Sequence, residues 1–182
     1  MNKINLSLFL ALLISPNLYA VEGVITFNGT IESVTCSSSI IGGGTNATAN
    51  ANTTVTLPTI NTTALASAQA TAGKTEFSIV LTDGNNGPCS LNGLAAKPYF
   101  VYESNKVETD GRLKNSTEAT TKVRIELLNN QSTQINVTQG ASQLLSTSVD
   151  DKTYTYFARY YALDTAAAGT VDGSVSYNII YQ

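Results

Sequence analysis

Short stretches in which apolar and polar residues alternate recur along the whole chain, and they constrain its fold more than any other feature. A period of two residues predicts β-strands that are buried on one face. The stretches cover residues 23–34, 54–60, 75–83, 97–104, 121–129, 133–138, 153–163 and 169–182. Turn-forming residues separate them, and no long apolar stripe follows a helical period. The sequence therefore predicts an all-β sandwich, in which residues 62–73 form a short helix or a loop.

The two ends of this pattern are both strand-like. In the closing stretch, residues 169–182, one face is largely apolar; its members are Val171, Gly173, Val175, Tyr177, Ile179 and Tyr181. Near the other end, residues 24–33 also alternate, and their apolar face holds Ile25, Phe27, Gly29 and Ile31. Strands this apolar need neighbours. The neighbour of each is either in the same chain or in another molecule.

The first 20 residues have the pattern of an export signal. Lys3 precedes the apolar run INLSLFLALLIS, and a small residue, Ala20, precedes a change to polar sequence. The run is too short for a membrane span, so we expect a signal peptide cleaved after Ala20; the alternative is a buried N-terminal helix. Cleavage would leave 182 − 20 = 162 residues, enough for one domain, with 9 basic and 13 acidic residues. That acidic balance gives no indication of nucleic acid or an anionic membrane.

Cys36 and Cys89 are the two cysteines of the chain, and in an oxidising compartment they fit one disulfide. Such a bridge would restrict the unfolded chain and thereby stabilise the fold by about 3–4 kcal/mol. The chain has no histidine, so neither a Ser-His-Asp site nor an ordinary metal site is expected. Asp150 and Asp151 form the one adjacent carboxylate pair, but they fall in a polar turn, where we expect solvated side chains. No enzyme, cofactor or metal is predicted.

At both ends the residues resemble the pilin subunits of chaperone–usher fimbriae, in particular the major-subunit group of type 1 pili. The C-terminus is similar to the pilin signature, with Gly169 fourteenth from the end and the aromatic Tyr181 next to last. YFARYYA at 156–162 resembles the segment that leads into the last pilin strand, and FNGTIESVTC at 27–36 resembles the pilin start. The chain departs from that group in residues 42–52 and 84–88, which resemble inserted loop, and the sequence assigns no role to the 42–52 insertion.

The resemblance implies an incomplete immunoglobulin-like sandwich that lacks its seventh strand. It divides the chain into a signal peptide (1–20), a donor-strand extension (21–34) and a pilin domain (35–182). Ile25, Phe27, Gly29 and Ile31 would be the inward residues of the donor strand. The acceptor groove would be formed by Gly169, Val171, Gly173, Val175, Tyr177, Ile179 and Tyr181. Neither end strand would be paired within its own subunit.

The resemblance also implies partners. A periplasmic chaperone would fill the groove first, and at an outer-membrane usher the extension of the next identical or related subunit would replace it. Polymerisation would be head-to-tail and would give an adhesive surface fimbria, with this chain as a shaft subunit and with no host receptor predicted. The alternatives are a minor tip subunit, a carbohydrate-binding adhesin, and an ordinary sandwich whose first and last strands pair within one chain.

Overall fold

The computed structural model describes residues 29, 36–43, 45–46, 53–83, 85, 87, 89–143, 146, 148 and 152–182, with the backbone alone for 45–46. Those from Cys36 onward belong to one compact unit, and Gly29 falls outside it. The expected signal peptide and, apart from Gly29, the expected donor strand therefore lie outside the described residues.

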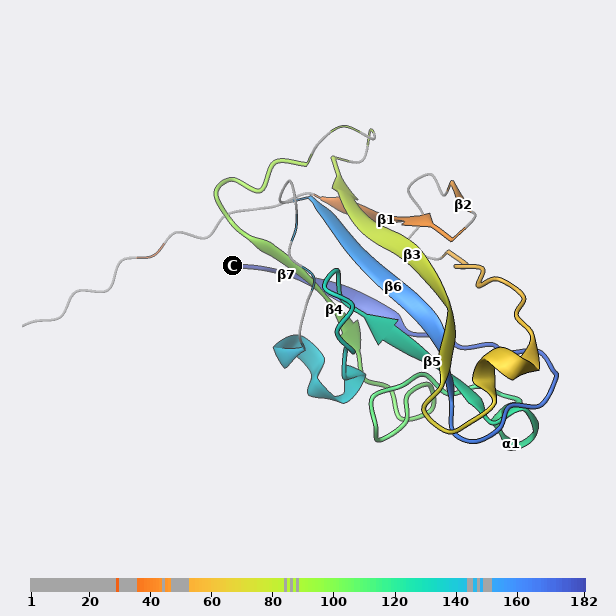
Figure 1. Cartoon of the computed structure of the whole chain (residues 1–182). Coiled ribbons are helices and arrows are strands. Elements are labelled where there is room, and N and C mark those ends of the chain that lie inside the picture. The colour runs from red at the N-terminus through yellow and green to blue at the C-terminus, as the bar shows by residue number, and fades with distance from the viewer. Residues whose placement is uncertain are drawn as a thin grey trace, which may run out of the picture. The chain divides into compact units, whose positions relative to one another are not determined.

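The larger of two sheets has five antiparallel strands in the order β2–β1–β3–β6–β5 (Figure 1). Their bounds are β1 Ser37–Gly42, β2 Thr45–Asn46, β3 Thr71–Thr82, β5 Val123–Leu128 and β6 Thr153–Ala162. In the central strands the side chains alternate between the core and the outside, as in β3, where Phe77, Ile79 and Leu81 are buried. This is the period-two pattern that the sequence carries.

The smaller sheet pairs two strands that are far apart in the sequence. β4 (Ala96–Val101) and β7 (Ser176–Tyr181) are antiparallel, with Ala96 opposite Tyr181 and Val101 opposite Ser176. One expectation is corrected here, because the closing strand does have a partner in its own chain along one edge. That pairing satisfies the backbone hydrogen bonds of one side of β7.

The core lies between the two sheets. Tyr156 of β6 stacks on Phe77 of β3, with ring centroids 5.7 Å apart, and meets Phe100 of β4 edge-on at 5.1 Å. The hydroxyls of Tyr154 and Tyr156 donate to the carbonyls of Ala96 and Pro98, at 2.6 and 3.3 Å. Both tyrosines thus bury their rings and still satisfy their polar ends, which fixes β4 against the larger sheet.

The helices are short: the 3-10 helices η1 (Thr62–Leu65) and η2 (Val137–Ser142), and the single turn α1 (Glu118–Thr121). The predicted strand at 133–138 is wrong, since its end belongs to η2, and the uncertain stretch 62–73 contains η1 and the start of β3. Residues 54–60 are extended, but they form no strand. Within the part of the chain that is described, no helix has the length and apolarity that crossing a bilayer requires.

Candidate functional site

An apolar groove opens beside β7, where the core is not fully covered. Its inner part has a volume of about 290 Å³ and adjoins an outer space of about 680 Å³ that shares several lining residues. The floor consists of core side chains from several strands and loops; they are Phe77, Ile79, Phe100, Leu113, Ile125, Leu127 and Ala158. These floor side chains are themselves buried, and the apolar surface that stays partly exposed in the groove belongs to its walls.

One wall of the groove is formed by β7 and by Val175, which directly precedes it. Val175, Tyr177 and Ile179 line it and stay partly exposed although they pack against the core. Along the edge opposite β4, β7 has no strand partner among the described residues. A strand edge of this kind presents free backbone N–H and C=O groups and can accept another strand.

The opposite wall is formed by Ile40 of β1 and by the extended segment at residues 53–57. Val55 and Leu57 pack against the core, whereas Thr54 and Thr56 are exposed, so the segment alternates like a strand. It belongs to neither sheet as described; a hydrogen bond from the Thr56 N–H to the Gly43 carbonyl, at 3.0 Å, holds it to the β1–β2 turn. The groove thus lies between two extended segments that are not paired with each other.

The walls are joined at one point. The Tyr177 hydroxyl lies 2.8 Å from Oγ of Ser38, which belongs to β1. This hydrogen bond links the smaller sheet to the larger one across the outer part of the groove, which both residues line. An amphipathic tyrosine suits such a place, because its ring covers apolar surface while its hydroxyl finds a polar partner.

A small polar cluster borders the groove at the start of β7. The Lys106 ammonium donates to Oε1 of Glu103 at 2.8 Å and to Oγ of Ser176 at 3.1 Å, and the Ser176 hydroxyl donates to the same glutamate oxygen at 2.6 Å. The hydrogen bond from Lys106 and that from Ser176 lower the pKa of Glu103 below its ordinary value. The cluster thus keeps a paired charge at the rim and leaves the floor apolar.

The predicted groove residues divide into two groups. Gly173, Val175, Tyr177 and Ile179 line the groove. Gly169 and Val171 instead line a separate cavity of about 480 Å³, together with residues such as Leu65 and Tyr160. Tyr181 packs against the core beside β4.

Of the predicted donor residues, the described Gly29 is exposed, and Ile25, Phe27 and Ile31 lie outside the described residues. The sequence reasoning did not identify Ser38, Lys106 or residues 53–57 as parts of the site. For residues 53–57 a signal was present, namely the alternation of Val55 and Leu57.

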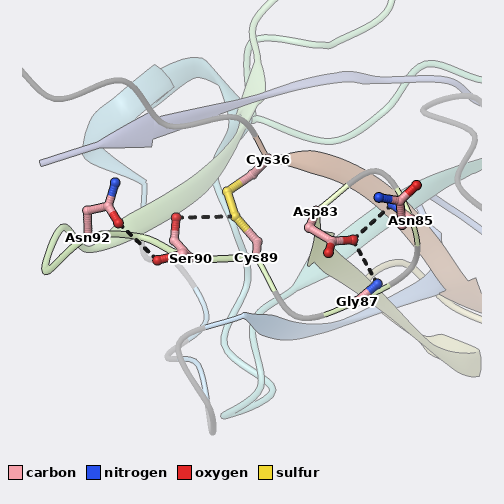
Figure 2. Close-up of a disulfide and its surroundings, with 7 residues drawn as sticks. All are labelled: Cys36, Asp83, Asn85, Gly87, Cys89, Ser90 and Asn92. Atoms are coloured by element: carbon pink, nitrogen blue, oxygen red, sulfur yellow. Dashed lines mark hydrogen bonds between the residues drawn. A yellow bond between two sulfur atoms is a disulfide. The ribbon is translucent and has the colours of Figure 1, made fainter.

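Cys36 and Cys89 form a disulfide, as predicted, with Cα atoms 5.6 Å apart (Figure 2). Cys36 directly precedes β1, and the β1–β3 pairing begins with Ser37 opposite Thr82, so the bridge lies where these neighbouring strands meet. The loop after β3 is organised by Asp83, whose carboxylate accepts from the backbone N–H groups of Asn85 and Gly87 at 2.9 and 2.8 Å. The start of β1 is thereby fixed to the β3–β4 connection.

The fold and the groove define a class: a two-sheet sandwich with an open apolar groove along one edge of β7. The family model described as "Fimbrial protein" matches residues 25–182. The chain belongs to this fimbrial protein family. It is a fimbrial subunit, which places it among other subunits in a surface filament.

Curated relatives cover nearly the whole chain. The F17 fimbrial protein of Escherichia coli is 34% identical over 169 residues, which are 90% of this chain and 89% of that protein. The major fimbrial subunit SMF-1 of Stenotrophomonas maltophilia (strain K279a) is 38% identical over 172 residues, with coverage of 89% and 94%. The minor fimbrial subunit HifD of Haemophilus influenzae is 30% identical over 188 residues, with coverage of 94% and 80%.

Solved structures agree on the fold. The P pilus rod subunit PapA is similar with a TM-score of 0.55 at 16% identity, over 88% of this chain and 100% of that one. A subunit from the structure of a chaperone–usher pilus is similar with a TM-score of 0.52 at 17% identity, over 92% and 100%. The fold is therefore the incomplete immunoglobulin-like sandwich that the resemblance to pilins implied.

Proposed function

We propose that this chain is a shaft subunit that polymerises head-to-tail by donor-strand exchange, with residues 21–34 of one subunit filling the β7 groove of the next. The observation that carries the proposal is the pair of unpaired extended walls, β7 and residues 53–57, on either side of an apolar floor. A strand between them could bond to both backbones and cover the core. Strand addition to an open edge is a common mode of recognition, of which chaperone–pilin complementation is itself a known example.

The composition of residues 21–34 suits this role. Ile25, Phe27 and Ile31 share one face with Gly29, while the other face is polar, so an inserted strand would bury apolar groups and leave hydroxyl and carboxylate groups in water. Donor and acceptor lie on different parts of one chain, so the contact is heterologous and extends into a filament. The shaft role is supported by the 38% identity to a major subunit, against 30% to a minor one.

The proposal includes a route to the surface. An apolar groove that faces water is an aggregation hazard, so a periplasmic chaperone that fills it before assembly is part of the proposal. Delivery to an outer-membrane usher would then allow the next subunit's extension to replace the chaperone strand. Export through the periplasm is consistent with the disulfide, which needs an oxidising compartment.

The test is a chain that carries its own donor. In what we call the complemented chain, residues 21–34 are moved from the N-terminus to a position after Gln182: the chain starts at residue 35, and a short flexible linker joins Gln182 to the transferred segment. The transferred segment is then present at high effective concentration beside β7. We expect a monomer with a cooperative thermal transition, whereas the chaperone-free mature chain should self-associate or unfold at lower temperature. Size-exclusion chromatography and calorimetry measure both.

A matched control separates groove filling from the mere transfer of residues. A complemented chain with Phe27→Asn and Ile31→Asn in the transferred segment keeps its length but cannot fill an apolar groove, and we expect it to behave like the unmodified chain. If the unmodified mature chain is a monomer with the same thermal midpoint as the complemented chain, the missing-strand proposal is wrong.

A further inference from the structure

The smaller sheet has two outer edges, one along β4 and one along β7. Ala95 and Gln182 exchange two hydrogen bonds, in which each N–H donates to the carbonyl of the other residue, at 2.7 and 2.9 Å. Every second residue from this pair therefore turns its backbone groups toward the partner strand. Within β4, the residues between them are Ala96, Pro98 and Phe100, and their backbone groups point away from β7. The partners of these groups decide whether another strand can be added along β4.

Gln143 satisfies both backbone groups of Phe100. Its Oε1 accepts from the Phe100 N–H at 3.1 Å, and its Nε2 donates to the Phe100 carbonyl at 2.5 Å. These are the two hydrogen bonds that a residue of an added antiparallel strand would make. The second hydrogen of Nε2 is also used, because Nε2 donates to the Val137 carbonyl at 3.2 Å, and Gln143 is only 6% exposed. The side-chain amide of Gln143 thus takes the place of a strand.

The other groups along the outer edge of β4 offer little to a further strand. The carbonyls of Ala96 and Pro98 accept from the hydroxyls of Tyr154 and Tyr156, which reach them from the larger sheet. Pro98 has no N–H, and proline is one of the residues that protect the edge of a sheet. Only the N–H of Ala96 has no hydrogen-bond partner among the described residues. One unpaired donor is too little for a strand ladder, so we regard the β4 edge as closed.

A glycine turn positions Gln143 beside β4. The helix η2 packs against β4, and Gln143 directly follows its last residue. Within η2, Gly140 has a φ of 53° and a ψ of −132°, a conformation that residues with a Cβ rarely adopt. The Gln143 N–H donates to the Gly140 carbonyl at 3.1 Å, which fixes the chain after this turn. A side chain of the length of glutamine then reaches the backbone of Phe100.

The edge of β7 has no such protection. The backbone groups of Tyr177, Ile179 and Tyr181 point away from β4, and none of these groups has a hydrogen-bond partner among the described residues. We propose that Gln143 closes the β4 edge of the smaller sheet and thereby restricts strand addition to β7. The inference rests on the proposed function for the identity of the strand that enters at β7. With one acceptor edge in this sheet, each subunit receives one neighbour there, and the filament grows without branches.

The complemented chain tests this role, because its β7 edge is already filled. Gln143→Met keeps the length of the side chain but leaves both backbone groups of Phe100 unpaired. We expect the complemented chain with Gln143→Met to form dimers and larger species as its concentration rises, since the β4 edge can then pair with another molecule. The complemented chain without this change should remain monomeric over the same range. Sedimentation velocity measures both.

Gln134→Met in the complemented chain is the matched control. The Gln134 amide also bonds at both ends, accepting from Nη2 of Arg112 at 3.1 Å and donating to the Asp110 carbonyl at 3.2 Å. Its partners belong to the 110–112 turn rather than to the edge of a strand, so this variant should lose stability and remain monomeric. Monomeric behaviour of Gln143→Met, or equal association of the two variants, would overturn the inference. Self-association of the complemented chain itself would instead reject the proposed function.

A second measurement needs neither a variant nor the complemented chain. Hydrogen–deuterium exchange in purified filaments, read residue by residue by mass spectrometry, compares two N–H groups on the same edge of β4. The Phe100 N–H, which Gln143 holds, should exchange more slowly than the unpartnered Ala96 N–H by about tenfold or more. Equal exchange of the two groups would show that Gln143 does not close this edge, whatever the fate of the Gln143→Met variant.

Discussion

Arg112 donates from both Nε and Nη2 to one carboxylate oxygen of Glu126, at 3.0 and 2.6 Å. Arg159 reaches the other oxygen from Nε at 2.6 Å, and the Glu126 side chain is only 2% exposed. This carboxylate has almost no contact with water, and the two guanidinium groups supply its hydrogen bonds instead. The three residues therefore connect β5 and β6 to the 110–112 turn through one buried charge.

Replacing Glu126 by alanine should destabilise the complemented chain by up to about 3 kcal/mol, the lower end of the cost of removing one partner of a buried pair. The lower end applies because Arg159 is 28% exposed and can be hydrated when its partner is lost. Chemical denaturation of the complemented chain measures this change. The control is Glu108→Gln, whose carboxylate lies in looser contacts with Lys114 at 3.6 Å and Arg124 at 4.0 Å; it should cost at most about 1 kcal/mol. Equal losses in the two variants would show that burial of Glu126 is not the cause.

Asp110 should make the fold sensitive to acid. Burial opposes ionisation of this carboxyl, but hydrogen bonds from Arg112 and the charges of Arg124 and Arg112 outweigh it and lower the pKa below the ordinary value of 3.8. A lowered folded-state pKa contributes stability that is present above the ordinary pKa and is lost as the pH falls through the folded one. Asp110→Asn should therefore be less stable than the parent at neutral pH, and the two should converge in acid. Thermal midpoints of both proteins measured from neutral pH downward check this, and a constant difference at all pH values would contradict it.

Loss of the disulfide should reduce the amount of subunit that the chaperone can capture. The bridge closes a loop with a sequence separation of 53, worth about 4 kcal/mol on the chain-entropy view. We predict that it forms before capture, so that Cys36→Ser with Cys89→Ser lowers the periplasmic yield of the chaperone complex. Mass spectrometry of the wild-type complex should detect no free thiol. Two free thiols in a complex recovered at full yield would contradict the prediction.

The sequence prediction failed in segments whose side chains alternate between apolar and polar but whose backbone does not pair with a neighbouring strand along its length. Ile135 and Val137 alternate and are fully buried, yet their N–H groups donate to Leu127 and Gly111, and Asn136 begins η2 by accepting from the Thr138 N–H. Alternation reports which side chains are buried, whereas a strand also needs a backbone partner along its length. The predicted strands at 54–60 and 133–138 failed for this reason, while those that became β3, β4, β5 and β6 had such partners.

Other features have no local signal at all. β1 has the sequence SSSIIG, in which Ile40 packs against the core while Ser38, on the same face, is polar and interrupts the apolar pattern. The hydrogen bond between Ser38 and Tyr177 joins residues that are 139 positions apart. The apolar face of the closing stretch could be predicted from residues 171–181, but the partner of Tyr177 across the groove could not, because only the folded arrangement brings the two sheets together.

The Cys36–Cys89 bridge has a mechanical consequence for a filament joined through residues 21–34. Tension that enters a subunit at its N-terminal extension reaches Cys36 and can pass through the two sulfur atoms to Cys89, then along the chain to β4. β4 is hydrogen-bonded to β7, the strand at which the neighbouring subunit would be gripped. The covalent loop that contains β1, β2, η1 and β3 is thus spared the load and cannot be drawn out while the bridge is intact. A subunit pulled lengthwise would resist along a short path through one disulfide and one strand pair.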